Sequence, residues 1–300
     1  MRRELRAFIG TLILVTAAQS QATIYYQRNY SEVEALLKSF EIRYPDVATV
    51  VSVGESNSGK IIESIRIGNS GPAHLVVAAH HGNEYTSTEL AMAFAEDLAR
   101  NPILGAQIYI VPVLNISGFD LRQRWEKVGG YPFDPNRDYP GPCGAEGPWE
   151  LRSTKALADF LESEEIVAAA TLHSYYPAVV YPWGNYARDY STPNDDRFIE
   201  LAEHAVVRSN YEIGFSGEVI YPADGTFEDY AYWKHGIWSL LFELGYERYP
   251  DDRDLDRMIV DNLPGLRAMF ENAPAQRALD HEFNNGCVSS LNRGFDPHNE

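Results

Sequence analysis

The amino-acid sequence predicts an α/β fold in a single large domain, with a mixed, mostly parallel sheet covered by helices on both faces. Three observations support this prediction. Several strand-like segments are short and almost entirely apolar, as expected of strands that are buried on both faces. Amphipathic helical segments alternate with them along the chain. The sequence has 300 residues, is 45% hydrophobic and contains no repeat or low-complexity linker after residue 22, so it can form one sizeable core.

Helices and strands are expected in turn along the N-terminal half. A helix over residues 31–44 would place Val33, Leu37 and Phe40 on one face, and Ser31 is expected to cap it. Residues 86–89 read Thr-Ser-Thr-Glu, a capping-box pattern, which predicts the start of a second helix that ends before Pro102. Apolar runs predict strands over residues 49–53, 62–67, 75–79 and 108–114.

The C-terminal half repeats this alternation. Helices are expected over residues 151–163, 197–210, 229–235 and 254–272, and strands over residues 166–172, 179–181 and 238–244. In sheets of this kind, ligands bind outside the carboxyl ends of the strands. His81, His173 and Glu243 each lie at or just after the end of an apolar strand, so we expect the functional site there.

His81 and Glu84 form a His-x-x-Glu pair in the turn after the strand at residues 75–79. An imidazole and a carboxylate three residues apart can face one metal ion, and zinc favours such nitrogen and oxygen ligands. A catalytic zinc site has three protein ligands and an open position for water, and His173 is the candidate for the third ligand. His80 is an alternative to His81. Taken alone, the motif is more simply explained as two ordinary polar residues of a turn.

Two further segments carry charged residues that need a partner. Glu243 lies inside an apolar run, where a carboxylate is costly to bury unless it is paired. It is either the partner of an arginine or a general base beside a zinc-bound water. The loop at residues 134–140 contains Asn136 and Arg137, which together suit a carboxylate ligand. A turn with a surface arginine has the same pattern.

In this order, the segments resemble the zinc metallocarboxypeptidases, the carboxypeptidase A-like family (peptidase family M14). The resemblance covers roughly residues 25–272 and implies an α/β sandwich around a mixed eight-stranded sheet. The motifs that carry it are His81-x-x-Glu84, Asn136-Arg137, the stretch from Leu172 to Gly184, Tyr221, and Phe242-Glu243-Leu244.

The resemblance also implies a role for each matching residue. Glu243 would activate the water and shuttle its proton. The metal ligands, which would hold one Zn²⁺ per chain, would be His81, Glu84 and His173. The residues that bind the C-terminal carboxylate of a peptide would be Asn136, Arg137 and Tyr221.

Three finer expectations follow from the same resemblance. An arginine should stabilise the oxyanion, and we predict Arg124, with Arg122 as the alternative. Glu228 falls where family members select the terminal side chain, so its acid predicts a preference for C-terminal Lys or Arg; the alternative is a helix-start glutamate that faces water. Asp138 stands where the family commonly has asparagine, so we expect it to weaken anion binding or to bind a basic group instead.

The sequence therefore predicts a zinc-dependent exopeptidase that removes C-terminal amino acids from peptides or proteins. One alternative is a zinc amidase or deacylase acting on N-acyl amino acids or cell-wall peptides, which would share the metal site. Another is a non-catalytic module that binds peptide ends, although Glu243 argues against a dead site. The formal net charge of −18 makes nucleic acid and anionic membranes unfavourable partners, because like charges repel.

Residues 1–22 have the basic, apolar and small-residue parts of a secretory signal peptide, so we expect a periplasmic or extracellular protein. Its removal would leave a net charge of −20, since that segment carries three arginines and one glutamate. The catalytic domain is expected over residues 23–272, with no inhibitory pro-segment before it and a tail of unknown role over residues 273–300. Cys143 and Cys287 could form one disulfide in an oxidising compartment, which the sequence leaves open.

Overall fold

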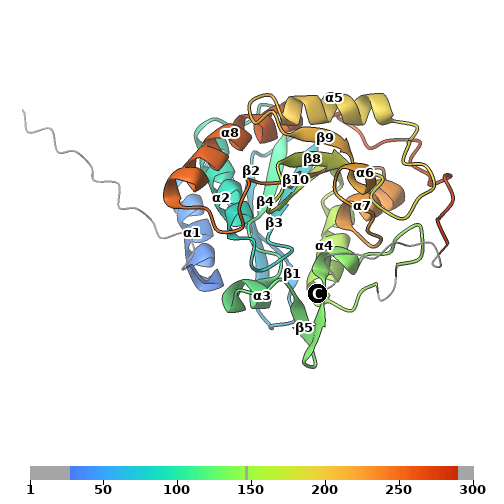
Figure 1. The fold of residues 1–300 in the computed structure, drawn as a ribbon. Coiled ribbons are helices and arrows are strands. Elements are labelled where there is room, and N and C mark those ends of the chain that lie inside the picture. The colour runs from blue at the N-terminus through green and yellow to red at the C-terminus, as the bar shows by residue number, and fades with distance from the viewer. Residues whose placement is uncertain (1–27, 146–147, 290–300) are drawn as a thin grey trace, which may run out of the picture.

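A computed structural model describes residues 28–145 and 148–289 and places an eight-stranded sheet at the centre of the molecule (Figure 1). From one edge to the other, its strands are β1 (Ala48–Glu55), β2 (Ile61–Ile67), β4 (Gln107–Val111), β3 (Ala73–Ala78), β7 (Ile166–His173), β10 (Trp238–Glu243), β8 (Ala178–Tyr181) and β9 (Glu212–Phe215). The four central strands, β4, β3, β7 and β10, are parallel, as are β8 and β9, whereas the β1–β2, β2–β4 and β10–β8 pairs are antiparallel. The predicted mixed, mostly parallel sheet is confirmed.

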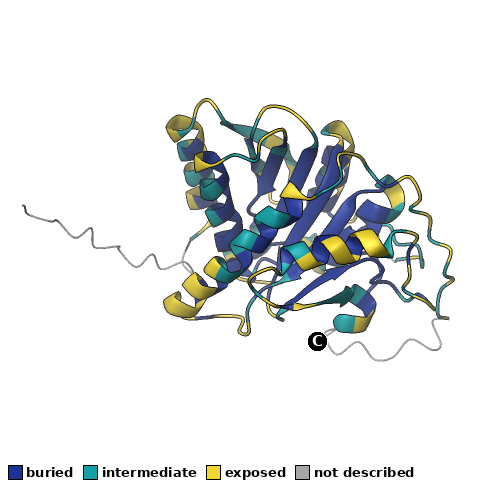
Figure 2. Ribbon diagram, turned by 90° about the horizontal axis from the view of Figure 1, so that it is seen from above, coloured by how far each residue is buried: buried dark blue, intermediate teal, exposed yellow. Residues whose placement is uncertain are grey.

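The middle of the sheet is buried on both faces. Every residue of β3 and β7 is buried, which explains why these strands read as continuous apolar runs. In Figure 1, α1 (Tyr30–Arg43), α2 (Tyr85–Arg100) and α8 (Asp252–Glu271) lie on one side of the sheet, and α4 (Arg152–Ser163) and α7 (Phe227–His235) lie on the other. Helix α8 also packs against α5 (Asp195–Ala205). Figure 2 shows the buried strands between helices whose outer faces are exposed.

Several short elements were not predicted. They are α3 (Ile116–Leu121), the β5–β6 hairpin (Glu126–Val128 and Tyr131–Phe133), the 3₁₀ turn η2 (Pro135–Arg137), β9 and α6 (Ser216–Val219). Each has only three to six residues, too few for a hydrophobic period to show in the sequence.

Both predicted helix caps are wrong. Helix α1 is capped by Asn29, not Ser31, because the Asn29 side chain accepts a hydrogen bond from the Glu32 amide and the Glu32 carboxylate accepts one from the Asn29 amide. The capping-box pattern at residues 86–89 lies inside α2 rather than at its start. There, the Ser87 hydroxyl donates to the Glu84 carbonyl (2.6 Å) and accepts from the Ala79 amide (3.1 Å). This serine therefore fixes the turn that carries the His-x-x-Glu pair.

The described part of the predicted tail, residues 273–289, packs on the domain. Cys287 forms a disulfide with Cys143, with a Cα–Cα distance of 5.6 Å. Its backbone also pairs with that of Ala187 in an isolated antiparallel β-bridge. The Phe283 ring meets the Trp183 ring edge-on at 5.1 Å. This segment therefore joins the loop at residue 143 to the one that follows β8.

The predicted signal peptide lies outside the described residues. Within residues 28–145 and 148–289, no helix is both long and apolar enough to cross a membrane. The boundaries expected at residues 22 and 272 stay predictions.

Candidate active site

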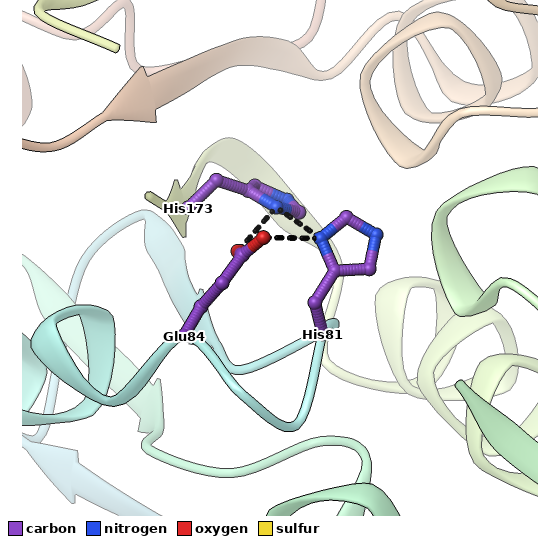
Figure 3. Close-up of side chains that lie close together, drawn as sticks. All are labelled: His81, Glu84 and His173. Atoms are coloured by element: carbon purple, nitrogen blue, oxygen red, sulfur yellow. Dashed lines mark hydrogen bonds and ion pairs between the residues drawn. The ribbon is translucent and has the colours of Figure 1, made fainter. Parts of the chain in front are cut away.

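The three predicted metal ligands meet beyond the carboxyl ends of β3 and β7 (Figure 3). These strands are neighbours, with Ala78 paired to Leu172, so the residues that follow each strand lie at one edge of the sheet. His81 Nδ1 is 2.7 Å from Glu84 Oε1, and His173 Nδ1 is 3.1 Å from Glu84 Oε2. The two Nδ1 atoms are 3.2 Å apart, and all three side chains are buried. Two imidazole nitrogens and a carboxylate thus face one point.

This group fits a zinc ion. In the part of the chain that the structure describes, it is the one group of His, Cys, Asp or Glu residues with ligand atoms all within 4.8 Å of one another. His81 Nε2 lies 3.0 Å from Asp134 Oδ1, and a proton shared with this carboxylate leaves the Nδ1 lone pair directed at the group. Two nitrogen ligands and one oxygen ligand are a donor set that zinc favours.

The turn that carries His81 and Glu84 is held by its surroundings. Ser87 binds both ends of the turn, and the Gly82 amide points to the Arg124 carbonyl (3.4 Å). A Cβ atom at Gly82 would lie 2.0 Å from the Gly118 carbonyl carbon, so only glycine lets the turn approach α3 this closely.

His80 lies outside the ligand group. Its Nε2 atom is 3.1 Å from the Tyr139 hydroxyl, and its ring stacks on His173 at 5.4 Å. Burial and then the neighbouring His173 and His81 hold the pKa of His80 well below its usual value. In this arrangement His80 supports the third ligand from behind, and His81 faces the site.

Glu243 ends β10 beside the metal-binding group. It is paired with His173 in the parallel β7–β10 register. With Glu84, Arg124 and Tyr221, it lines a cavity of about 350 Å³. Among the described residues its carboxylate has no hydrogen-bond or ion-pair partner, so the alternative of a salt bridge to an arginine finds no support. Burial, reinforced by the charge of Glu84, raises its pKa well above the usual value, while Arg124 opposes this shift.

Of the two predicted arginines, Arg124 lies at the site. Its Nη1 atom is 3.2 Å from His81 Nδ1 and 3.7 Å from Glu84 Oε1, and it also lines the cavity. Asp134 holds the other side of this guanidinium at 2.8 and 3.1 Å. Arg122 instead donates to the Arg28 carbonyl (2.7 Å) and lies over the Tyr85 ring (4.1 Å).

Asp134 belongs to the same cluster of side chains, and the sequence analysis gave it no role. It contacts both His81 and Arg124, and it accepts from the Asn136 amide (2.9 Å). Burial alone would raise its pKa, but the charges of His81, Arg137 and Arg124 hold that pKa well below its usual range. The signal in the sequence is its place two residues before Asn136, in the same polar loop.

The predicted carboxylate-binding residues come together next to the cavity. Arg137 Nη2 donates to the Tyr221 hydroxyl (3.2 Å), although the two residues are 84 positions apart. Asn136 Oδ1 accepts from the Phe227 amide at the start of α7 (2.8 Å). The loop with Arg137 is thereby tied to the segment with Tyr221. We call Asn136, Arg137 and Tyr221 the carboxylate clamp.

The Asp138 carboxylate binds the start of α4, and its expected effect on anions or basic groups stays a prediction. Its carboxylate accepts hydrogen bonds from the Glu150 and Leu151 amides (2.9 and 3.0 Å) and from the Thr154 hydroxyl. It therefore holds the start of α4. Burial raises its pKa to about 6.

Glu228 is buried in the first turn of α7, with 3% of its surface exposed. Thr171 donates a hydrogen bond to its carboxylate from the middle of β7. The alternative of a helix-start glutamate that faces water is therefore wrong. Its charge adds to the upward shift in the pKa of Glu243.

Comparison with known proteins identifies the family to which the chain belongs. A family model described as zinc carboxypeptidase matches residues 33–265. The chain therefore belongs to the zinc carboxypeptidase family, a class of metallocarboxypeptidases that are zinc-dependent hydrolases. The resemblance noted in the sequence is confirmed.

Similar proteins include carboxypeptidases whose sequence identity to this chain is low. Carboxypeptidase M of Mus musculus is 26% identical over 309 residues, which cover 87% of this chain and 68% of that protein. Carboxypeptidase B of Bos taurus is 26% identical over 265 residues, which cover 72% of this chain and 62% of that protein. The chain thus spans about two thirds of the length of these relatives.

A solved structure shows the same fold. The structure of bovine thrombin-activatable fibrinolysis inhibitor in complex with tick carboxypeptidase inhibitor matches with a TM-score of 0.74 and 23% sequence identity. The match covers 82% of this chain and 97% of that chain, so the fold extends over nearly the whole of the solved chain.

Proposed function

We propose that the protein removes C-terminal amino acids from peptides by hydrolysis, with His81, Glu84 and His173 as ligands of one Zn²⁺. The observation that carries this proposal is the single cavity in which Glu243 and Arg124 lie beside Glu84. When bound, zinc supplies Lewis-acid polarisation of the scissile carbonyl and lowers the pKa of water. The remaining steps belong to residues of the chain.

Glu243 is the general base and then the general acid. It accepts a proton from the attacking water as the water oxygen bonds to the carbonyl carbon. When the carbon–nitrogen bond breaks, Glu243 delivers that proton to the leaving amine. Arg124 stabilises the negative charge that develops on the carbonyl oxygen, because Asp134 already holds its guanidinium toward the site.

The carboxylate clamp selects the end of a peptide. Arg137 binds the terminal carboxylate, with Asn136 and Tyr221 beside it. A chain end fixed in this way presents only its last peptide bond to Glu243, so the cleavage is exopeptidic.

Glu228 gives the enzyme a preference for C-terminal Lys or Arg. Within residues 28–145 and 148–289, the one side-chain donor to this buried carboxylate is a neutral hydroxyl, so the carboxylate is a favourable partner for a cationic side chain. Release of terminal Lys and Phe from matched peptides tests this, with Glu228→Gln as the variant. We expect wild type to favour Lys and the variant to lose that preference; faster release of Phe by wild type would contradict the idea.

The decisive experiment combines zinc content with hydrolysis of blocked dipeptides by wild type and Glu243→Gln. We expect about one zinc in both proteins, and turnover only in wild type. A matched dipeptide with an amidated C-terminus should not be cleaved. Cleavage of the amidated peptide would favour the amidase or deacylase alternative, and zinc binding without any cleavage would favour a peptide-end binding module. Wild type without zinc would refute the ligand assignment.

The protein is exported, to the periplasm or to the medium. The signal-peptide pattern at residues 1–22 supports this, and so does the Cys143–Cys287 disulfide, since such bonds persist in oxidising compartments. Fractionation of a producing cell, with N-terminal sequencing of the product, tests it. We expect a mature chain that begins near residue 23 and lies outside the cytoplasm.

A further inference from the structure

Two buried carboxylates flank the segment that carries the proposed oxyanion arginine and the first residues of the carboxylate clamp. Glu126 is the first residue of β5, two positions after Arg124, and Asp138 directly follows Arg137. Glu126 is 0% exposed and Asp138 is 3% exposed. In the part of the chain that the structure describes, the donors to both carboxylates are neutral amides and hydroxyls. A buried carboxylate is costly without such donors, so these contacts fix where each one lies.

Most of these donors come from the start of α4. The Ser153 hydroxyl donates to Glu126, and the Thr154 hydroxyl donates to Asp138. The Leu151 amide, at the N-cap of α4, also donates to Asp138 (3.0 Å). Leu151 has no side-chain cap to offer and the first turn holds no acidic residue, so the two carboxylates supply the negative charge that a helix N-terminus favours. We call Glu126, Asp138, Ser153 and Thr154 the α4 anchor.

The Glu126 half of the α4 anchor is tied to Arg124. Glu126 pairs with Phe133 across the β5–β6 hairpin, and Asp134 directly follows Phe133. Asp134 in turn holds the Arg124 guanidinium at 2.8 and 3.1 Å. Glu126 also accepts from the Asn57 amide (3.3 Å), so a second element fixes the base of the hairpin. The position of Glu126 therefore determines where both ends of the hairpin present the arginine and its carboxylate partner.

The Asp138 half is tied to the carboxylate clamp. Asp138 is the C-cap of η2, the turn that contains Asn136 and Arg137. Its backbone carbonyl accepts from the Trp149 amide (2.9 Å), so its backbone and its side chain are both held by the residues around the start of α4. The position of Asp138 therefore determines where Arg137 meets Tyr221, to which it donates at 3.2 Å.

We propose that the two halves of the α4 anchor position different arginines and have different kinetic effects. The half with Glu126 positions Arg124 for the charge of the transition state, so its loss lowers kcat. The half with Asp138 positions Arg137 for the terminal carboxylate of the substrate, so its loss raises KM. The inference rests on the proposed carboxypeptidase function and adds positioning residues that act through the two arginines.

The test compares two neighbouring residues of one helix, with kcat and KM measured on a peptide that has a free C-terminus. In Ser153→Ala we expect kcat to fall about 3- to 10-fold, less than the roughly 10²- to 10³-fold cost of losing an oxyanion donor itself, with KM near wild type. In Thr154→Ala we expect KM to rise about 3- to 10-fold, the size of one hydrogen bond, with kcat near wild type. Ser153→Thr and Thr154→Ser keep the hydroxyls and should retain the wild-type values.

Variants on the acceptor side test the same contacts without a change in side-chain shape. Glu126→Gln should lower kcat, and Asp138→Asn should raise KM. The direction of the second change separates two roles of Asp138. If this carboxylate instead weakens anion binding, its replacement should lower KM, and the positioning role would be wrong.

Ser163→Ala is the matched control. Ser163 ends the same helix, and its hydroxyl donates to the Phe160 carbonyl within that helix (3.3 Å), so kcat and KM should both stay at the wild-type values. The assignment would be overturned if Ser153→Ala and Thr154→Ala changed the same kinetic parameter, or if no variant of the α4 anchor changed either.

Failure of the alanine and acceptor-side variants alike to fold would also overturn it, since the anchor would then hold the whole domain rather than one arginine at a time. In each of these cases, peptide cleavage by wild type would still support the proposed function. Wild type that cleaves no peptide with a free C-terminus would refute the proposed function and this inference with it.

Discussion

The metal-binding group and the carboxylate clamp lie close together but are built differently. His81 and Glu84 follow β3, and His173 ends the adjacent, fully buried β7, so the register of the sheet sets the positions of these three proposed ligands. The clamp residues Arg137 and Tyr221 lie on loops that are far apart in the sequence. In the proposed function, the sheet thus positions the metal ligands, while contacts between loops position the residues that would select a substrate end.

The loops of the clamp need several supports because no strand pairing orders them. The Tyr139 amide donates to the Gly225 carbonyl (3.1 Å), and Asn136 binds the start of α7. Gly225 has a φ of +76°, and a Cβ there would lie 2.5 Å from the Arg137 carbonyl oxygen, so the close approach requires glycine. The Cys143–Cys287 disulfide fastens the loop that follows Arg137 to the C-terminal segment.

Loss of a metal ligand should have the largest effect. In His173→Ala, we expect zinc content well below one per chain and a fall in kcat/KM of at least about 10³-fold, since the Lewis acid contributes several kcal/mol. Metal analysis and peptide hydrolysis measure the two quantities.

Arg137→Ala is the control from the other region. It should keep its zinc and lose about 10- to 150-fold in kcat/KM, the value of one charge-assisted hydrogen bond. If His173→Ala keeps a full zinc complement, or if Arg137→Ala loses its zinc, the two regions are not separable in the way the fold indicates.

Loss of the Cys143–Cys287 disulfide should lower the free energy of unfolding, because it frees the loop next to the carboxylate clamp. The bond closes a loop with a sequence separation of 144 residues, and removal of such a cross-link costs about 2–5 kcal/mol in the free energy of unfolding. We expect Cys287→Ser to show this loss in urea titration. Its zinc content at low denaturant should stay near that of wild type, because the proposed ligands lie at the carboxyl ends of the central strands.

Wild type under reducing conditions is the control for this variant, and its unfolding midpoint should fall by the same amount. Unfolding curves that coincide for oxidised wild type and Cys287→Ser would show that the C-terminal segment holds its place without the cross-link.

The same division decides what the sequence could reveal. The meeting of His81, His173 and Glu243 was predictable because each lies at or just after the end of an apolar strand, and parallel strands bring their carboxyl ends to one edge. The roles of Asp138 and of the capping-box pattern at residues 86–89 were not predictable. Each depends on a tertiary hydrogen-bond partner, which the local sequence does not reveal.

The smallest effect is expected at Asp134, which touches both regions. Its carboxylate contacts His81 and Arg124 and accepts from the Asn136 amide, so it links a metal ligand to the first residue of the clamp. Asp134→Asn keeps the shape of the side chain but removes the charge that orients the imidazole. We expect a 10- to 100-fold weaker zinc affinity, the usual result of losing such a supporting carboxylate, measured by competition with a chelator.

The control for Asp134→Asn removes an equal charge elsewhere. Asp159 pairs with Lys155 on the exposed side of α4, so Asp159→Asn should leave the zinc affinity unchanged. Zinc affinity equal to wild type in Asp134→Asn would mean that packing alone orients His81. A further loss of kcat at saturating zinc would instead place the second effect at Arg124, since that guanidinium loses its ion pair in the same variant. The two readouts therefore separate the metal-binding role of Asp134 from its role in holding the oxyanion arginine.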